Sequence, residues 1–193
     1  GYGEDPFLSG SMGSAYVRGL QGEDVGSGEN VIATLKHFTA YGVPEGGHNA
    51  GMAHVGVREL LTELSYPFEM AVKAGALSLM TAYNEVDGIP CTANPFLTNQ
   101  LLREQWGFSG FVVSDLYSID GLVSQRVAAN REEAGMLALR SGVDSDLGGN
   151  CFAAGLVKAC REGRLAEADI DRAACRVLRL KFEMGLFDNP YVE

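Results

Sequence analysis

The feature that most constrains the fold of this chain is a strand-like apolar run that recurs four times and ends each time in polar residues. The four runs lie at residues 31–38, 76–83, 111–115 and 142–147. Near-continuous apolar runs of this length are typical of parallel strands that are buried on both faces of a sheet. Amphipathic helical patterns separate or follow them, at residues 57–73, 94–105, 131–140 and 166–184. The sequence therefore predicts an α/β protein built on a parallel sheet.

Four consecutive strand–helix units correspond to half of a TIM-like (β/α)8 barrel, which needs eight strands and typically about 250 residues. Since four strands cannot close a barrel, we expect residues 1–187 to be its C-terminal half, incomplete without upstream strands. Residues 188–193 are expected to begin a linker to a following domain. A doubly wound open sheet is the alternative. It would favour a glycine-rich phosphate turn of the GxGxxG or GxxxxGK(S/T) type, and neither occurs in the sequence.

Charge and composition argue against several kinds of partner. The formal net charge of −10 disfavours nucleic acid and anionic membrane surfaces, because both attract Lys and Arg. No apolar run approaches the roughly 18 residues of a membrane-spanning helix. His48 and His54 have no Cys or Asp at ligand spacing and are interpreted as loop residues. We expect no metal and no cofactor. Buried or partly buried free thiols are predicted at Cys91, Cys151, Cys160 and Cys175.

Polar side chains end each predicted strand, and the carboxyl ends of adjacent parallel strands meet at one end of a barrel. The set comprises Lys36, His37, Thr81, Tyr83, Asn84, Ser114, Asp115, Asp144 and Asp146. Asp115 is the first catalytic candidate, because an ionised carboxylate is costly to bury at the end of an apolar strand. A carboxylate with a cation, an imidazole and a phenol suits a polyhydroxylated substrate. Asp144 and Asp146 are interpreted as local hydrogen-bonding groups of the last loop.

Short motifs also occur in a fixed order along the chain. They are GYGEDP (1–6), KHF (36–38), YG (41–42), EGG (45–47), YN (83–84), GIP (88–90), LLR (101–103), WGF (106–108), VSD (113–115) and KFEMGLF (181–187). In this order the chain resembles, over essentially its whole length, the catalytic barrel of glycoside hydrolase family 3. The similarity is to the β-glucosidase and β-xylosidase branch of that family.

The resemblance implies an exo-acting, retaining glycosidase that releases terminal β-D-glucose from a β-glucoside or an oligosaccharide. Asp115 would be the nucleophile of a double displacement. Lys36 and His37 would bind sugar hydroxyls, and Tyr83 would donate a hydrogen bond to the nucleophile. Two alternatives stay open: a β-xylosidase or α-arabinofuranosidase of the same family, and a non-catalytic carbohydrate-binding fragment. The β-N-acetylhexosaminidase branch is disfavoured, because Thr-Ala-Tyr-Gly at 39–42 replaces the Pro-Gly-His-Gly stretch of its loop.

The resemblance further implies that other parts of the same polypeptide act as partners of this chain. The upstream half of the barrel would carry an Arg and an Asp that bind sugar, and a following domain would supply the acid/base Glu. The chain alone is therefore expected to be inactive. Glu45 is the best internal rival for the acid/base role. Leu116 departs from the Trp that many family members carry after the nucleophile. Family members are periplasmic or secreted in many cases, and the sequence itself does not decide the localisation.

Overall fold

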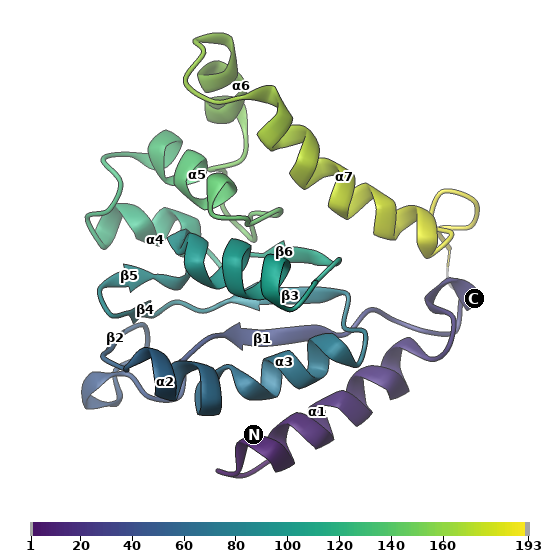
Figure 1. Ribbon diagram of the computed structural model, residues 1–193. Coiled ribbons are helices and arrows are strands. Elements are labelled where there is room, and N and C mark those ends of the chain that lie inside the picture. Colours follow the sequence, from purple (N-terminus) through teal and green to yellow (C-terminus); the bar gives the residue numbers. More distant parts are fainter. Residues whose placement is uncertain (1, 192–193) are drawn as a thin grey trace.

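A parallel sheet of three strands forms the centre of the computed structural model (Figure 1). The model describes residues 2–191, so Gly1 of the first motif and residues 192–193 of the predicted linker lie outside the described residues. The strands are β1 (Thr34–Phe38), β3 (Ser78–Thr81) and β6 (Phe111–Val113), paired in the order β1-β3-β6. Ser145 extends the sheet by one parallel bridge to Val113. The predicted α/β class with a parallel sheet is confirmed.

Each strand is shorter than the apolar run that predicted it, because groups at the strand ends bond elsewhere. Before β1, the Ala33 N–H donates to the side-chain oxygen of Gln21 at 3.2 Å. In the fourth run, the Asp144 carboxylate accepts the Val112 N–H at 2.8 Å. A side chain therefore takes the place of a main-chain carbonyl in the ladder. This reduces the fourth predicted strand to the bridge at Ser145.

The main core lies between one face of this sheet and the helices that cover it. The strand register places Leu35, Leu79 and Val112 side by side, and the latter two are fully buried. Thr34 and Lys36 alternate with Leu35 along β1, and both are exposed. Because side chains alternate across a strand, the first part of β1 directs Leu35 toward the core and Thr34 and Lys36 away from it. The register shifts between Leu35 and Phe38, and Phe38 is buried as well. The core also contains Phe38, Leu97, Leu101, Leu102, Ile119 and Leu122.

Helices α4 to α7 follow β6 and lie above the sheet in Figure 1, whereas α1 and α3 lie below it. The predicted helix 131–140 forms with the same bounds, because Asn130 caps it by accepting the Glu133 N–H at 3.0 Å. The predicted helix 166–184 is one residue shorter at each end. These four helices are α4 (Ser118–Ser124), α5 (Arg131–Arg140), α6 (Ala154–Arg161) and α7 (Glu167–Glu183).

The predicted helix 57–73 is interrupted, because Pro67 has no N–H and its ring clashes with the carbonyl four residues before it. The Ser65 N–H bonds instead to the Leu60 carbonyl at 2.8 Å, which makes a wide π-type turn. The segments are α2 (Val57–Glu59), η3 (Leu60–Leu64) and α3 (Tyr66–Lys73). The predicted helix 94–105 forms as η5 (Phe96–Gln105), with Asn94 accepting the Phe96 N–H at 3.1 Å.

Helices α1 (Pro6–Gln21) and α6 were not predicted from the sequence. In α1, glycine-rich sequence conceals the apolar period. The structure shows the use of one of these glycines: a Cβ on Gly10 would clash with the Met70 side chain, so glycine allows α1 to pack closely on α3. The smaller unpredicted elements are η1 (Val25–Ser27), η2 (Glu45–Gly47), η4 (Cys91–Ala93), β2 (Met52–Ala53), β4 (Glu85–Val86) and β5 (Ile89–Pro90). None of the helices within residues 2–191 is long and apolar enough to cross a membrane.

All four cysteines are free thiols, as predicted, but their burial differs. Cys91 and Cys151 are buried, and burial raises the pKa of each thiol to about 12. Cys160 is partly buried. The prediction of burial is wrong for Cys175, which lies exposed on α7.

Asp144 joins three elements through a buried ion-pair network. Its carboxylate is 1% exposed and pairs with Arg103 of η5 at 2.6 Å and with Arg176 of α7 at 2.8 Å. The same carboxylate accepts the Val112 N–H of β6. Burial lowers the pKa of Arg103 to about 10, which still leaves the guanidinium charged at neutral pH. The interpretation of Asp144 as a group of the last loop alone is therefore wrong, since its partners lie on β6, η5 and α7.

Replacement of Asp144 by Ala is expected to lower the free energy of unfolding by about 3 kcal/mol, because it leaves two guanidinium groups without their shared buried partner. Lys73→Ala is the control, since it removes an exposed ion pair with Glu69 on α3. Urea denaturation of the intact protein measures both. A loss for Asp144→Ala no larger than that for Lys73→Ala would contradict this account.

Candidate active site

Asp115 lies two residues after the end of β6 and is 7% exposed. Its Oδ1 accepts the N–H of Leu116 at 2.7 Å, which fixes the orientation of the carboxylate. Its Oδ2 lies 3.4 Å from Nε2 of His37 and has no hydrogen-bond partner among the described residues. A buried acceptor without a partner costs free energy. One oxygen of Asp115 is therefore anchored, and the other is left available to a ligand.

His37 and Lys36 lie on β1, which is separated from β6 in the sheet by β3. Burial lowers the pKa of His37 below its ordinary value, the charge of Asp115 opposes this effect, and Lys36 reinforces it. The imidazole is therefore neutral at pH 7. Its ring packs on Tyr41, with 4.6 Å between the ring centroids. These residues line a hollow of about 260 Å³. Tyr41 belongs to the YG motif, but the sequence did not predict a role for it. Its position four residues after His37 is the sequence signal that could have indicated this contact.

Tyr83 follows β3 and lies close to Asp115, but its hydroxyl donates to the main-chain carbonyl of Leu116 at 2.8 Å. Burial raises the pKa of Tyr83, and the negative charge of Asp115 raises it further. The side-chain amide of Gln125, the residue that follows α4, donates to the Tyr83 carbonyl at 3.1 Å. Tyr83 therefore connects β3 to the loop that follows Asp115. The hydrogen bond predicted from Tyr83 to the carboxylate stays a prediction.

The other polar strand-end residues, which were predicted to gather near Asp115, form hydrogen bonds within the protein. The Asn84 amide donates to the Thr39 carbonyl at 3.1 Å, and Thr81 bonds to Thr92 at 3.0 Å. Ser114 Oγ accepts the Leu147 N–H at 2.9 Å. Asp146 accepts the Cys151 N–H at 2.8 Å, which agrees with its interpretation as a local group of the last loop. These side chains hold the loops around Asp115 in place.

Glu45 and His54 form an exposed pair on the loops between β1 and α2. Glu45 Oε1 lies 2.7 Å from His54 Nδ1, and both side chains are more than half exposed. His48 is also exposed. No group of three His, Cys, Asp or Glu side chains within residues 2–191 is arranged to hold a metal ion.

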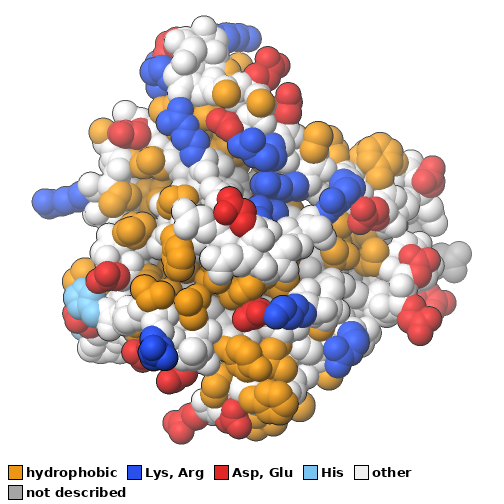
Figure 2. All heavy atoms as spheres, in the orientation of Figure 1, with side chains coloured by type: hydrophobic (Ala, Val, Ile, Leu, Met, Phe, Trp, Pro, Cys, Tyr) orange, Lys and Arg blue, Asp and Glu red, His pale blue; other side chains and the backbone are white. Residues whose placement is uncertain are grey.

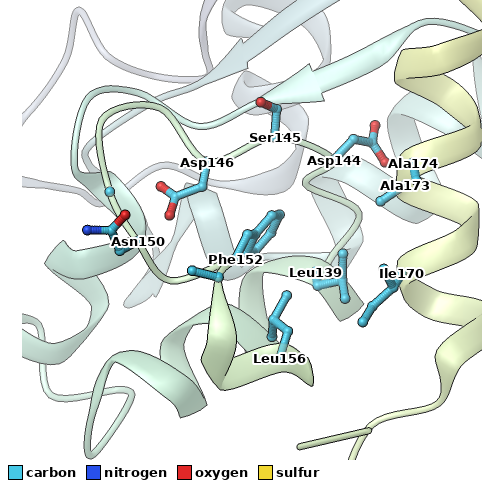
Figure 3. Close-up of a pocket in the computed structure, with 12 residues that line it drawn as sticks. Leu139, Asp144, Ser145, Asp146, Asn150, Phe152, Leu156, Ile170, Ala173 and Ala174 are labelled. Carbon is cyan, nitrogen blue, oxygen red and sulfur yellow. The ribbon is translucent and has the colours of Figure 1, made fainter. Parts of the chain in front are cut away.

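A separate hollow of about 380 Å³ lies between α5, α6 and α7, beside Asp144 and Asp146 (Figure 3). Its walls include Phe152, Leu156 and Ile170. Its lining does not include Asp115, His37, Lys36 or Tyr83, and both oxygens of Asp144 are already engaged there by arginines. We therefore place the candidate active site at Asp115.

Curated relatives match the chain along nearly its whole length. It is 34% identical to the periplasmic β-glucosidase of Salmonella typhimurium, over 99% of this chain and 25% of that protein. It is 39% identical to a putative β-xylosidase of Formosa agariphila, over 100% of this chain and 26% of that protein. The chain therefore spans about a quarter of the length of these relatives.

Solved structures show the same similarity. The β-glucosidase from Listeria innocua superposes with a TM-score of 0.94 at 37% identity, over 98% of this chain and 26% of that chain. A mutant of that enzyme was solved in complex with laminaribiose and gives a TM-score of 0.96 at 36% identity, over the same shares of each chain. The model of the glycosyl hydrolase family 3 N-terminal domain matches residues 1–180. The resemblance read from the motifs is thus confirmed, and the chain belongs to glycoside hydrolase family 3.

Proposed function

We propose that the intact protein is a retaining, exo-acting glycosidase that releases terminal β-D-glucose from β-glucosides, with Asp115 as the nucleophile. One observation carries this proposal: Oδ2 of Asp115 is buried and unpartnered, and it lies beside a hollow whose wall contains Lys36 and His37. Membership of family 3 supports the reaction class, and the β-glucosidases among its relatives support glucose.

The proposed reaction begins with attack of Asp115 Oδ2 on the anomeric carbon. The glycosidic C–O bond breaks as the new C–O bond to Asp115 forms, and an acid protonates the leaving oxygen. Water then attacks the glycosyl ester, the same acid/base takes its proton, and the carboxylate is released. The Leu116 N–H holds Oδ1 in place, so that Oδ2 is the oxygen positioned to attack.

Lys36 and His37 are proposed to bind the hydroxyls of the sugar. Lys36 is exposed and forms no ion pair within residues 2–191, so its ammonium hydrogens are available to a ligand. The neutral imidazole of His37 has both a donor and an acceptor nitrogen. The adjacent ring of Tyr41 offers an apolar wall to the C–H groups of a sugar ring.

The strands are proposed to form half of a (β/α)8 barrel that other parts of the polypeptide complete. Helix α1 supports this proposal, because Phe7 and Tyr16 are 61% and 62% exposed and Leu8 and Met12 are nearly half exposed. Figure 2 shows apolar side chains gathered at the bottom of the view, where Figure 1 places α1. An apolar surface of this kind is expected to pack against further structure.

A second candidate function is hydrolysis of β-xylosides or α-arabinofuranosides. It is favoured by the 39% identity to two β-xylosidases of Formosa agariphila. A panel of nitrophenyl glycosides on the intact protein separates the candidates by their kcat/KM values. Sugar binding without turnover of any of these substrates would indicate a non-catalytic carbohydrate-binding protein instead.

The general acid is proposed to come from a following domain, to which residues 188–193 would lead. A retaining enzyme needs a second carboxyl group about 5–5.5 Å from the nucleophile. Two carboxylates near the site form ion pairs with arginines: Asp120 pairs with Arg131, and Asp144 is held by two arginines. Glu45, the best internal rival, is paired with His54 in solvent.

Asp115→Asn in the intact protein is expected to lower kcat by at least about 10³-fold, because an amide of nearly the same size cannot form the glycosyl ester. Substrate binding and the melting temperature should change little. Asp87→Asn is the matched control, since Asp87 lies in an exposed turn with φ +49°, a conformation that Asn also adopts. Near-wild-type kcat in Asp115→Asn would remove Asp115 from the nucleophile role.

Glu45→Gln is expected to slow glycosides with poor and with activated leaving groups by the same small factor. Loss of the true acid slows the first kind far more, because only a poor leaving group needs protonation. The measurement is kcat/KM for methyl and for dinitrophenyl glycosides. A selective loss with the methyl glycoside in Glu45→Gln would place the acid in this chain.

A further inference from the structure

A hollow of about 330 Å³ between η5, α5 and α7 is rich in arginine, and we call it the arginine hollow. Its walls contain Arg103, Arg140, Arg172 and Arg176, together with Glu104. The chain has 15 Lys and Arg residues against 25 Asp and Glu, so four arginines around one hollow are a local excess of positive charge. Figure 2 shows Lys and Arg side chains gathered in the upper part of the view, where Figure 1 places α5 and α7. A concave surface of this charge favours an anionic ligand.

The arginine hollow lies at the end of the sheet opposite to Asp115. Arg103 donates to the Gly110 carbonyl at 3.0 Å and to the Gly142 carbonyl at 3.5 Å. Gly110 directly precedes β6 and Gly142 opens the fourth apolar run, whereas Asp115 lies beyond the carboxyl end of β6. The arginine hollow also shares no lining residue with the hollow beside His37. A ligand bound here would therefore not occupy the candidate active site.

Contacts within the protein account for only two of the four arginines. Arg103 and Arg176 are paired with the buried carboxylate of Asp144. Arg140 and Arg172 are exposed, and each donates a single hydrogen bond within the described part of the chain. Because a guanidinium group has five N–H donors, most of the donors of these two side chains are available to a ligand.

Asp144 does not fully compensate the positive charge around the arginine hollow. Burial lowers the pKa of Arg103, Asp144 opposes this effect, and the charges of Arg176 and Arg179 lower the pKa further. The Nε of Arg103 is buried and has no hydrogen-bond partner among the described residues. An anion bound near these groups would reduce the repulsion between their like charges.

The wall that carries Arg140 is held in place before any ligand binds. Asn99 Nδ2 donates to the Arg140 carbonyl at 3.0 Å, which ties the last residue of α5 to η5. Gly142 has φ +95°, and a Cβ at this position would clash with the Asn99 side chain, so glycine permits the contact. A preformed wall lowers the entropic cost of binding.

We propose that the arginine hollow binds the phosphate group of a small molecule, with Arg140 and Arg172 as its main contacts. Guanidinium groups present paired N–H donors that match the spacing of phosphate oxygens. Inorganic phosphate and a sugar phosphate offer the same group to these arginines. Glu104 favours the sugar phosphate, because its carboxylate accepts hydrogen bonds from hydroxyl groups. The proposal does not depend on the proposed function.

The test measures dissociation constants of inorganic phosphate and of glucose 6-phosphate for the intact protein, by calorimetric titration at low ionic strength. Arg172→Gln is expected to raise both constants about tenfold, because it removes charged hydrogen bonds to the phosphate. Its melting temperature should change little, since the ion pair of Arg172 with Asp169 is exposed. Arg58→Gln is the matched control: it removes one exposed charge on α2 and should leave both constants within about twofold.

The two ligands also distinguish the source of the phosphate. Tighter binding of glucose 6-phosphate than of inorganic phosphate would identify a sugar phosphate as the ligand, and equal constants would identify the free anion. Failure of both compounds to bind below about 10 mM would overturn the proposal. Equal constants for Arg172→Gln and Arg58→Gln would overturn it as well, because binding would then occur elsewhere. Neither result bears on the proposed function, which is tested by the turnover of Asp115→Asn.

Discussion

The parallel pairing of β1, β3 and β6, extended to Ser145, is the constraint on which the rest of this structure depends. It brings to one edge of the sheet residues that are far apart in sequence, and it places His37 Nε2 3.4 Å from Asp115 Oδ2. The pairing of β6 with the fourth strand is reinforced by Asp144, whose carboxylate bonds to Val112 and to arginines of η5 and α7. A buried ion-pair network thus fixes the strand that carries the proposed nucleophile.

At Asp115 the structure leaves one interaction unmade. Three neighbouring strand-end residues donate or share hydrogen bonds within the protein: Asn84 bonds to Thr39, Thr81 to Thr92, and Tyr83 to Leu116. Oδ2 of Asp115 has none among the described residues. A buried carboxylate oxygen without a partner is available to a ligand, as the proposed nucleophile requires for reaction at an anomeric carbon.

The sequence predicted what depends on local pattern and missed what depends on contacts between distant residues. The strands were found because apolar runs buried on both faces are visible in sequence, and η5 because Asn94 followed by Pro95 is a recognisable helix start. Pro67 could have predicted the interruption of the helix 57–73, but the helical spacing of the apolar residues around Pro67 suggested a continuous helix. Helix α1 was missed, because its glycines serve close packing on Met70 rather than a helical pattern. The partners of Asp144 and the acceptor of Tyr83 lie 30 or more residues away in sequence, and only the fold brings them together.

The most direct test of the central claim is to trap the glycosyl-enzyme ester in the intact protein. A 2-deoxy-2-fluoro glycosyl fluoride slows the second displacement, so that the covalent intermediate accumulates and can be located by peptide mass spectrometry. The account predicts a single modified peptide, with the sugar attached to Asp115 and inactivation proportional to labelling. Attachment to a different carboxylate, or continued turnover without any labelled peptide, would contradict it.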